Sequence, residues 1–186
     1  MSPLLVNGKT EKELLKACLS GNRSAQRDIF YLYSGKMMAV CQRFAKNRQE
    51  AEDVLQDAFV KVFTHMHEFA NAGSFEGWVR RIVINTAIKN NLKNHTIFQE
   101  LDPELVKEDM VPPEVFSSLS EEELIRLITS IPDGYRTVFN LYVIEGFTHK
   151  EIAEMLHIEE ATSRSQLAKA RRLLQEKVTQ LYKQAV

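Results

Sequence analysis

Hydrophobic residues recur with a helical period along most of this chain. After Gly21-Asn22, apolar residues three or four positions apart mark one face of a long helix, namely Ile29, Phe30, Tyr33, Met37, Val40, Cys41 and Phe44. A second helix follows, with an apolar face that runs from Ala51 to Met66 and an acidic, polar face opposite. A third starts near Phe75, and its inward residues are predicted to be Trp78, Ile82 and Ala87. The first half therefore predicts a compact all-α unit.

The pattern fails in the middle of the chain. Between His95 and Leu119, Pro103 and Pro112-Pro113 break any helix, and apolar residues follow neither the helical nor the strand period. We predict an all-α fold of two small helical domains, residues 1–94 and 120–186, joined by a flexible acidic linker at 95–119.

The second domain begins with two predicted helices. The first is marked by apolar residues between Leu124 and Ile128. The second opens at Pro132 and ends at Gly146. Its inward residues are predicted to be Val138, Phe139, Tyr142 and Val143.

Residues 146–174 have the pattern of a helix-turn-helix. Thr148 is a suitable N-cap, and Glu151 three residues later completes a capping box. After a turn at 157–160, the second helix carries the apolar stripe Leu167, Ala170, Leu174, Val178 and Leu181. A step of about 100° per residue places Thr162, Ser165, Lys169 and Arg172 on the opposite face, with Arg164 beside them. These types suit a DNA recognition helix, although a solvated basic face is also common in all-α proteins.

Charge is segregated along the chain, although the formal net charge is only −1. Residues 80–94 contain four cations and no acid, and residues 161–186 contain six cations and one acid. Residues 99–124 contain nine acids and one lysine. A near-neutral average therefore does not exclude DNA binding by the two basic regions.

Composition narrows the functional class. Cys18 and Cys41 are too few for a disulfide framework and are expected to be buried small hydrophobes in a reducing cytosol. No apolar run approaches the ~18 residues of a membrane span, and the amino terminus lacks a signal-peptide pattern, so we expect a cytoplasmic protein without membrane insertion. Because no phosphate loop or nucleophile–base set is evident, we expect no enzyme activity, cofactor, metal or small-molecule substrate.

Two blocks of sequence resemble the sigma-70 family of RNA polymerase sigma factors. Ile131-Pro132, Gly146-Phe147-Thr148 and Glu151-Ile152-Ala153 resemble the family's fourth region, which the stretch from Ala161 to Arg171 continues. Residues 51–59 resemble its second region, whose downstream part is matched by Phe75, Trp78, Arg81-Ile82 and Asn85-Thr86-Ala87. The absence of other sigma regions points to the small extracytoplasmic-function (ECF) group.

The resemblance implies a non-enzymatic subunit that directs core RNA polymerase to specific promoters and assists DNA melting. In the family, the polar face of the second-region helix docks on the polymerase, and the matching residues are Asp53, Gln56 and Asp57. That face could equally be solvated. Sigma factors of this group are commonly held inactive by an anti-sigma factor, which is therefore an expected partner beside core polymerase and promoter DNA.

The resemblance also implies DNA-binding residues in both domains. A family loop captures a base flipped from the minus-ten element, and Phe69, Asn71 and Asn85 match that pocket. Trp78 is expected to support the pocket, and Arg80, Arg81 and Lys89 are expected to contact DNA phosphates. Phe69 could equally be a core residue that closes the loop. In the second domain, Thr162, Arg164, Ser165 and Lys169 match positions that read the minus-thirty-five element, and Arg172 shares their face.

The sequence is also compatible with two other functions. A conventional helix-turn-helix regulator would bind duplex DNA without core polymerase, as a dimer on a palindrome. A protein-binding helical adaptor would not need the charges of Arg164 and Lys169.

Overall fold

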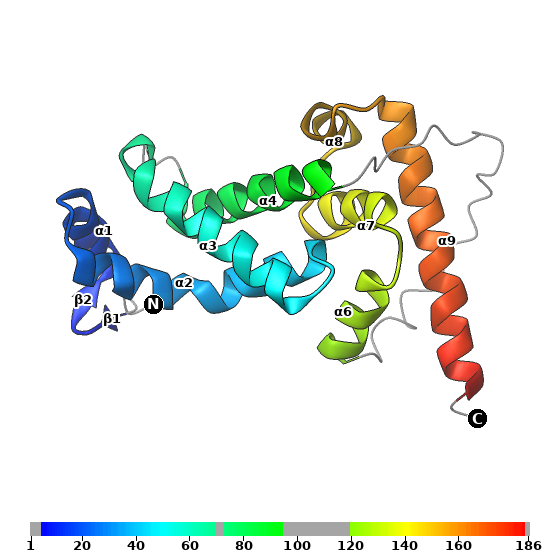
Figure 1. Cartoon of the computed structure of the whole chain (residues 1–186), viewed down its shortest axis with the longest axis horizontal. Coiled ribbons are helices and arrows are strands. Elements are labelled where there is room, and N and C mark those ends of the chain that lie inside the picture. The colour runs from blue at the N-terminus through cyan, green and yellow to red at the C-terminus, as the bar shows by residue number, and fades with distance from the viewer. Residues whose placement is uncertain (1–4, 70–72, 95–119, 185–186) are drawn as a thin grey trace. The chain divides into compact units, whose positions relative to one another are not determined.

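The computed structural model describes residues 5–69, 73–94 and 120–184. The predicted linker at 95–119 and the predicted site residue Asn71 lie outside the described residues. The expected all-α class is confirmed, with a short β-hairpin as an addition (Figure 1). The chain forms two compact units, one of residues 1–42 and 47–87 and the other of residues 43–46 and 88–186.

The hairpin stands at the start of the first unit. Strands β1 (Leu5–Val6) and β2 (Lys9–Thr10) pair antiparallel, and Asn7 and Gly8 connect them with φ of 51° and 76°. An Asn-Gly pair suits a two-residue turn that needs positive φ at both positions. The Asn7 amide donates a hydrogen bond of 2.9 Å to Asp28 Oδ1, which ties the hairpin to the helical core. Strands of two residues carry no detectable period, so the sequence did not predict them.

Four α-helices contribute to the first unit, and two of them continue past its limits. They are α1 (Glu11–Leu19), α2 (Arg23–Phe44), α3 (Arg48–Thr64) and α4 (Phe75–Asn94), with the 3₁₀ turn η1 (Met66–Glu68) after α3. Thr10 and Glu13 form a capping box at α1, and the Asn47 side chain accepts from the Glu50 amide at α3. The predicted apolar faces of α2 and α3 are buried, including Ile29, Met37, Ala51, Ala58 and Val62.

Side-chain contacts join α2, α3 and α4. The Phe30 and Phe59 rings meet edge-on with centroids 4.8 Å apart, which joins α2 to α3. Lys61 Nζ donates to Thr86 Oγ1 at 2.9 Å, which joins α3 to α4. Because α4 packs on both neighbours, its buried face includes the consecutive pair Val83-Ile84. The prediction that Trp78 and Ile82 face inward is only partly right, since both are half-buried.

Over residues 120–184, the second unit has five helical segments. They are α6 (Glu121–Thr129), α7 (Asp133–Phe139), the π-helical turn η3 (Asn140–Ile144), α8 (His149–Leu156) and α9 (Glu160–Gln184). Helices α6, α7 and α8 all pack against the long helix α9 (Figure 1). The core between them includes Ile128, Val138, Leu141, Ile152 and Leu174.

The π-helical turn changes which residues face the core. The Glu145 amide donates to the Asn140 carbonyl, five residues earlier, and Gly146 ends the segment with φ of 77°. One extra residue in a turn rotates the following side chains around the helix axis. The prediction that Tyr142 and Val143 point inward is therefore wrong, since they are 36% and 48% exposed.

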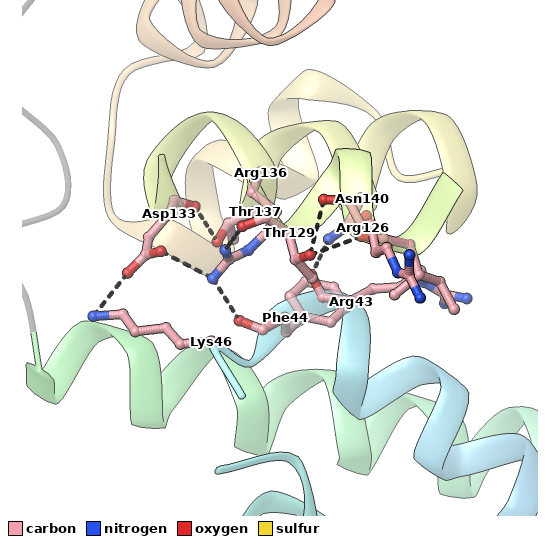
Figure 2. Close-up of polar contacts among 10 residues, drawn as sticks. Arg43, Phe44, Lys46, Arg126, Thr129, Asp133, Arg136, Thr137 and Asn140 are labelled. Atoms are coloured by element: carbon pink, nitrogen blue, oxygen red, sulfur yellow. Dashed lines mark hydrogen bonds and ion pairs between the residues drawn. The ribbon is translucent and has the colours of Figure 1, made fainter. Parts of the chain in front are cut away.

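Buried polar groups of α7 and η3 bind the short segment 43–46 of the same unit (Figure 2). Arg136, only 2% exposed, donates to the carbonyls of Thr129 and Phe44 at 3.1 Å each and pairs with Asp133 at 2.9 Å. Asn140 donates to the Arg43 carbonyl at 2.7 Å. The last carbonyls of a helix have no partner within it, so Arg136 and Asn140 supply donors to the end of α2.

Candidate nucleic-acid interface

The outer face of α3 is polar and contains one exposed apolar residue. Asp53, Gln56 and Asp57 are all exposed, as expected from the sequence. Val60 lies on the same face, three and four residues after Asp57 and Gln56, and is 66% exposed. Val60 therefore extends this polar row with one apolar side chain toward the C-terminal end of α3. Val60 is not among the predicted site residues, although its place opposite the buried residues of α3 could have identified it.

Three aromatic rings meet where α4 begins. Phe75 is 2% exposed, and its ring centroid lies 5.3 Å from that of Phe69 and 5.5 Å from that of Trp78. The Phe69 and Trp78 centroids are 5.6 Å apart, and both residues are half-buried. Phe75 thus supports two aromatic rings that remain accessible to a ligand. Phe69 and Trp78 are predicted site residues, whereas the supporting role of Phe75 is not evident from the sequence.

Tyr33 backs this aromatic cluster from α2. Its ring lies 5.6 Å from Phe75, and its hydroxyl donates a 2.7 Å hydrogen bond to Glu11. Burial, followed by the hydrogen bond to Glu11, raises the pKa of Tyr33 far above its usual range. Tyr33 is therefore a neutral, fixed partner of Phe75.

One face of α4 carries cationic and amide side chains at a spacing of four residues. Arg81, Asn85 and Lys89 are exposed along this line, while Arg80 is half-buried. Thr86 behind them is 1% exposed and donates to the Ile82 carbonyl at 2.8 Å. Exposed Arg and Lys on a helix face can neutralise phosphates, and Asn can hydrogen-bond a base.

The helix-turn-helix consists of α8, a turn and α9. Thr148 and Glu151 form the predicted capping box, with both donors of Thr148 2.8 Å from Glu151 Oε2. His157 ends α8 in the left-handed region with φ of 55°. Ile152 and Leu156 of α8 are buried.

The outer face of α9 carries the predicted recognition residues. Arg164 and Arg172 are exposed, and Thr162, Ser165 and Lys169 are half-buried. The apolar stripe is buried through Val178, but Leu181 is 44% exposed, so its predicted inward position is wrong.

Acidic side chains accompany the two arginines of this face. Arg164 Nη2 lies 2.8 Å from Glu160 Oε2, and Arg172 Nε lies 3.7 Å from Glu176 Oε1. All four side chains are largely solvated, and such pairs contribute at most about 1 kcal/mol. Both arginines can therefore exchange a carboxylate for a phosphate at little cost.

Comparison with known proteins identifies both regions. The family model for sigma-70 region 2 matches residues 30–95, and that for sigma-70 region 4 matches residues 121–174. The ECF RNA polymerase sigma factor SigW of Bacillus subtilis is 28% identical over 91% of this chain and 97% of its own length. The ECF RNA polymerase sigma-E factor of Haemophilus influenzae is 26% identical over 92% of this chain and 97% of its own length. This chain belongs to the ECF group of the sigma-70 family.

A solved structure supports the fold of this ECF sigma factor. This chain is similar in fold to the sigma factor RpoE of Bartonella quintana, which was solved in complex with the anti-sigma factor NepR. The TM-score is 0.52, and the identity is 20% over 81% of this chain and 94% of the other. The sigma-factor interpretation is favoured over a conventional regulator, which would leave the match to region 2 unexplained. Among the described residues, no helix is long and apolar enough to cross a bilayer.

Proposed function

We propose that this ECF sigma factor directs core RNA polymerase to specific promoters by reading the two promoter elements with separate regions. The supporting observation is that one chain combines the region 2 match, with its exposed α3 face and aromatic cluster, and the region 4 match, with its basic recognition face. Two weak DNA contacts mounted on one polymerase act at high effective concentration, so neither region needs to bind tightly alone.

In this proposal, the outer face of α3 binds core polymerase. Asp53, Gln56 and Asp57 supply polar contacts, and Val60, next along the same face, adds exposed apolar area. Truncation of central, fully desolvated residues usually costs more binding energy than truncation of rim residues.

The aromatic cluster and α4 bind the minus-ten element. Extruding a base costs a few kcal/mol, which stacking on an aromatic ring offsets by about 1–3 kcal/mol per base. Phe69 and Trp78 offer accessible rings, and Asn85 offers an amide on the adjacent helix. Arg80, Arg81 and Lys89 contact phosphates; Asn71 keeps its role in the pocket as a prediction from the resemblance.

The recognition face of α9 binds the minus-thirty-five element in the major groove. Thr162, Arg164, Ser165 and Lys169 meet base edges and phosphates, and Arg172 adds a phosphate contact. The domain limits of 1–94 and 120–186, with a linker between them, belong to this proposal. So do the absence of enzyme activity and a cytoplasmic location beside the polymerase.

An anti-sigma factor is a further proposed partner. The support is the family resemblance, in which an inhibitor covers the polymerase-binding faces. Co-purification of the tagged chain from its own host, with Val60→Glu as the matched variant, tests this partner. Loss of the same bound protein in the variant would place the inhibitor on the α3 face.

Transcription from a library of random promoters tests the whole proposal. Bacterial core polymerase is supplied with or without the protein, and start sites are sequenced. We expect specific starts only with both components, and weaker starts with Asn85→Ala or Lys169→Ala. Lys177→Ala, two turns beyond Lys169 on α9, is the matched control. A protein that bound duplex DNA but neither joined core polymerase nor directed initiation would instead be a conventional regulator.

A further inference from the structure

One imidazole connects three elements of the second unit. His149, the first residue of α8, stacks on Tyr142 of η3 with ring centroids 4.3 Å apart and planes at 22°. Its Nδ1 lies 2.9 Å from the hydroxyl oxygen of Ser163, in the first turns of α9. His149 is half-buried and Ser163 is 0% exposed. The side chain of His149 on α8 therefore contacts both the π-helical turn η3 and the recognition helix α9.

The hydrogen bond contributes to the position of α9 because it satisfies a buried group. A serine hydroxyl can donate to an imidazole nitrogen or accept from it, so either tautomer of His149 can keep the bond. A buried hydroxyl without a partner destabilises the fold. The stacked aromatic rings of His149 and Tyr142 add a further stabilising contact. These terms favour one placement of α9 relative to α8.

Ser163 lies between residues of the recognition face. Thr162 precedes it, Arg164 follows it, and Ser165 is two residues further along α9. A displacement of about 1 Å in a positioned group is enough to weaken recognition strongly. We propose that His149 is a positioning residue for the minus-thirty-five element, which sets the placement of α9 without contacting DNA. This inference rests on the proposed function of the recognition face.

The surroundings of His149 favour its neutral form. Burial lowers the pKa of His149, and the Arg164 and Arg171 charges on α9 lower it further, while Glu160 opposes them. Tyr142 faces the ring from η3, and Lys150 and Glu151 follow on α8 itself. For a histidine with a lowered pKa, the stabilisation is present above the unfolded value of 6.5 and is lost as pH falls through the folded value. Acidification below about pH 6.5 should therefore reduce the stability of the folded unit.

Four variants separate the hydrogen bond from the stack. His149→Phe keeps an aromatic ring but removes the bond, and His149→Asn keeps a polar group near the position of Nδ1. Ser163→Ala removes the partner from α9. His157→Asn is the control, because His157 is exposed and Asn tolerates the left-handed backbone there.

Initiation by the holoenzyme is compared on one promoter with an intact or scrambled minus-thirty-five element, under conditions where every variant is folded. His149→Phe and Ser163→Ala should lower the intact-to-scrambled ratio about five- to tenfold, the equivalent of one buried hydrogen bond. His149→Asn should recover most of the ratio, and His157→Asn should keep it. Folded variants whose ratio stays within about twofold of wild type would overturn the inference.

Two readouts do not depend on promoter activity. The midpoint of thermal unfolding should fall more for wild type than for His149→Asn between about pH 7 and pH 5.5. Amide hydrogens of residues 160–170 should exchange faster in His149→Phe and Ser163→Ala than in wild type. If wild type fails to direct initiation, the proposed function is refuted, and unchanged exchange in both variants would separately refute the positioning role.

Discussion

Replacement of Phe75 by leucine tests whether the aromatic cluster serves DNA melting as well as the core. Phe75 is 2% exposed, and its ring meets Tyr33, Phe69 and Trp78 at centroid distances of 5.3–5.6 Å. Leucine keeps most of the buried apolar area but loses the three ring pairs, each worth about 0.5–1.5 kcal/mol. Relaxation of the neighbouring side chains recovers part of the lost interaction energy, so we expect a loss of about 2 kcal/mol in the free energy of unfolding.

That loss should appear both in stability and in promoter opening. A change of about 1 kcal/mol lowers the unfolding midpoint by about 4–8 °C for a unit of this size, so the expected decrease is roughly 10–15 °C. Phe69 and Trp78 lose their support, so a flipped base gains less from stacking. Permanganate reactivity of thymines in the minus-ten element should fall about tenfold, which corresponds to ~1.4 kcal/mol, while binding to core polymerase is unchanged.

Val62→Ala is the matched control for this experiment. Val62 is 0% exposed on α3 and has no ring in the cluster, and removing two methyl groups should cost a similar ~2 kcal/mol. Both variants are assayed well below their unfolding midpoints. Equal losses of permanganate reactivity in the two variants would refute the argument, because melting would then follow stability alone.

Three further predictions concern other parts of the chain. Val60→Glu should weaken binding to core polymerase at least about tenfold in a competition assay, because it places a charge in the apolar part of the proposed interface. The control Leu19→Glu, at a position 58% exposed on α1, should leave binding unchanged. Lys169→Ala should reduce the salt slope of promoter binding by about one, and an unchanged slope would remove Lys169 from the phosphate contacts. Burial, with a smaller effect of the Asp28 charge, raises the pKa of Cys18 from 9.0 to about 11, so iodoacetamide should label it far more slowly in the folded protein than in urea. The same shift means that stability falls as pH rises above about 9 towards 11; equal labelling in both states would contradict the burial.

The helical architecture and the recognition face follow from the sequence because they depend on neighbours in the chain. A helical period needs only residues three or four apart, and it correctly placed Leu167, Ala170 and Leu174 in the core. The capping box of Thr148 and Glu151 is equally local and forms as predicted. The same period predicted that Asp53 and Asp57 lie on the outer face of α3, and both are exposed.

Contacts between distant segments were decided only by the tertiary structure. The π-helical turn moved Tyr142 out of the core, and a period of 3.6 residues cannot anticipate an inserted residue. Phe75 looks like one apolar residue among many until α2 brings Tyr33 beside it. His149 and Ser163 are fourteen residues apart, and only the packing of α8 on α9 brings their side chains within hydrogen-bonding distance. Local periodicity specifies which face of a helix is buried, whereas the partner of each side chain depends on how the helices pack.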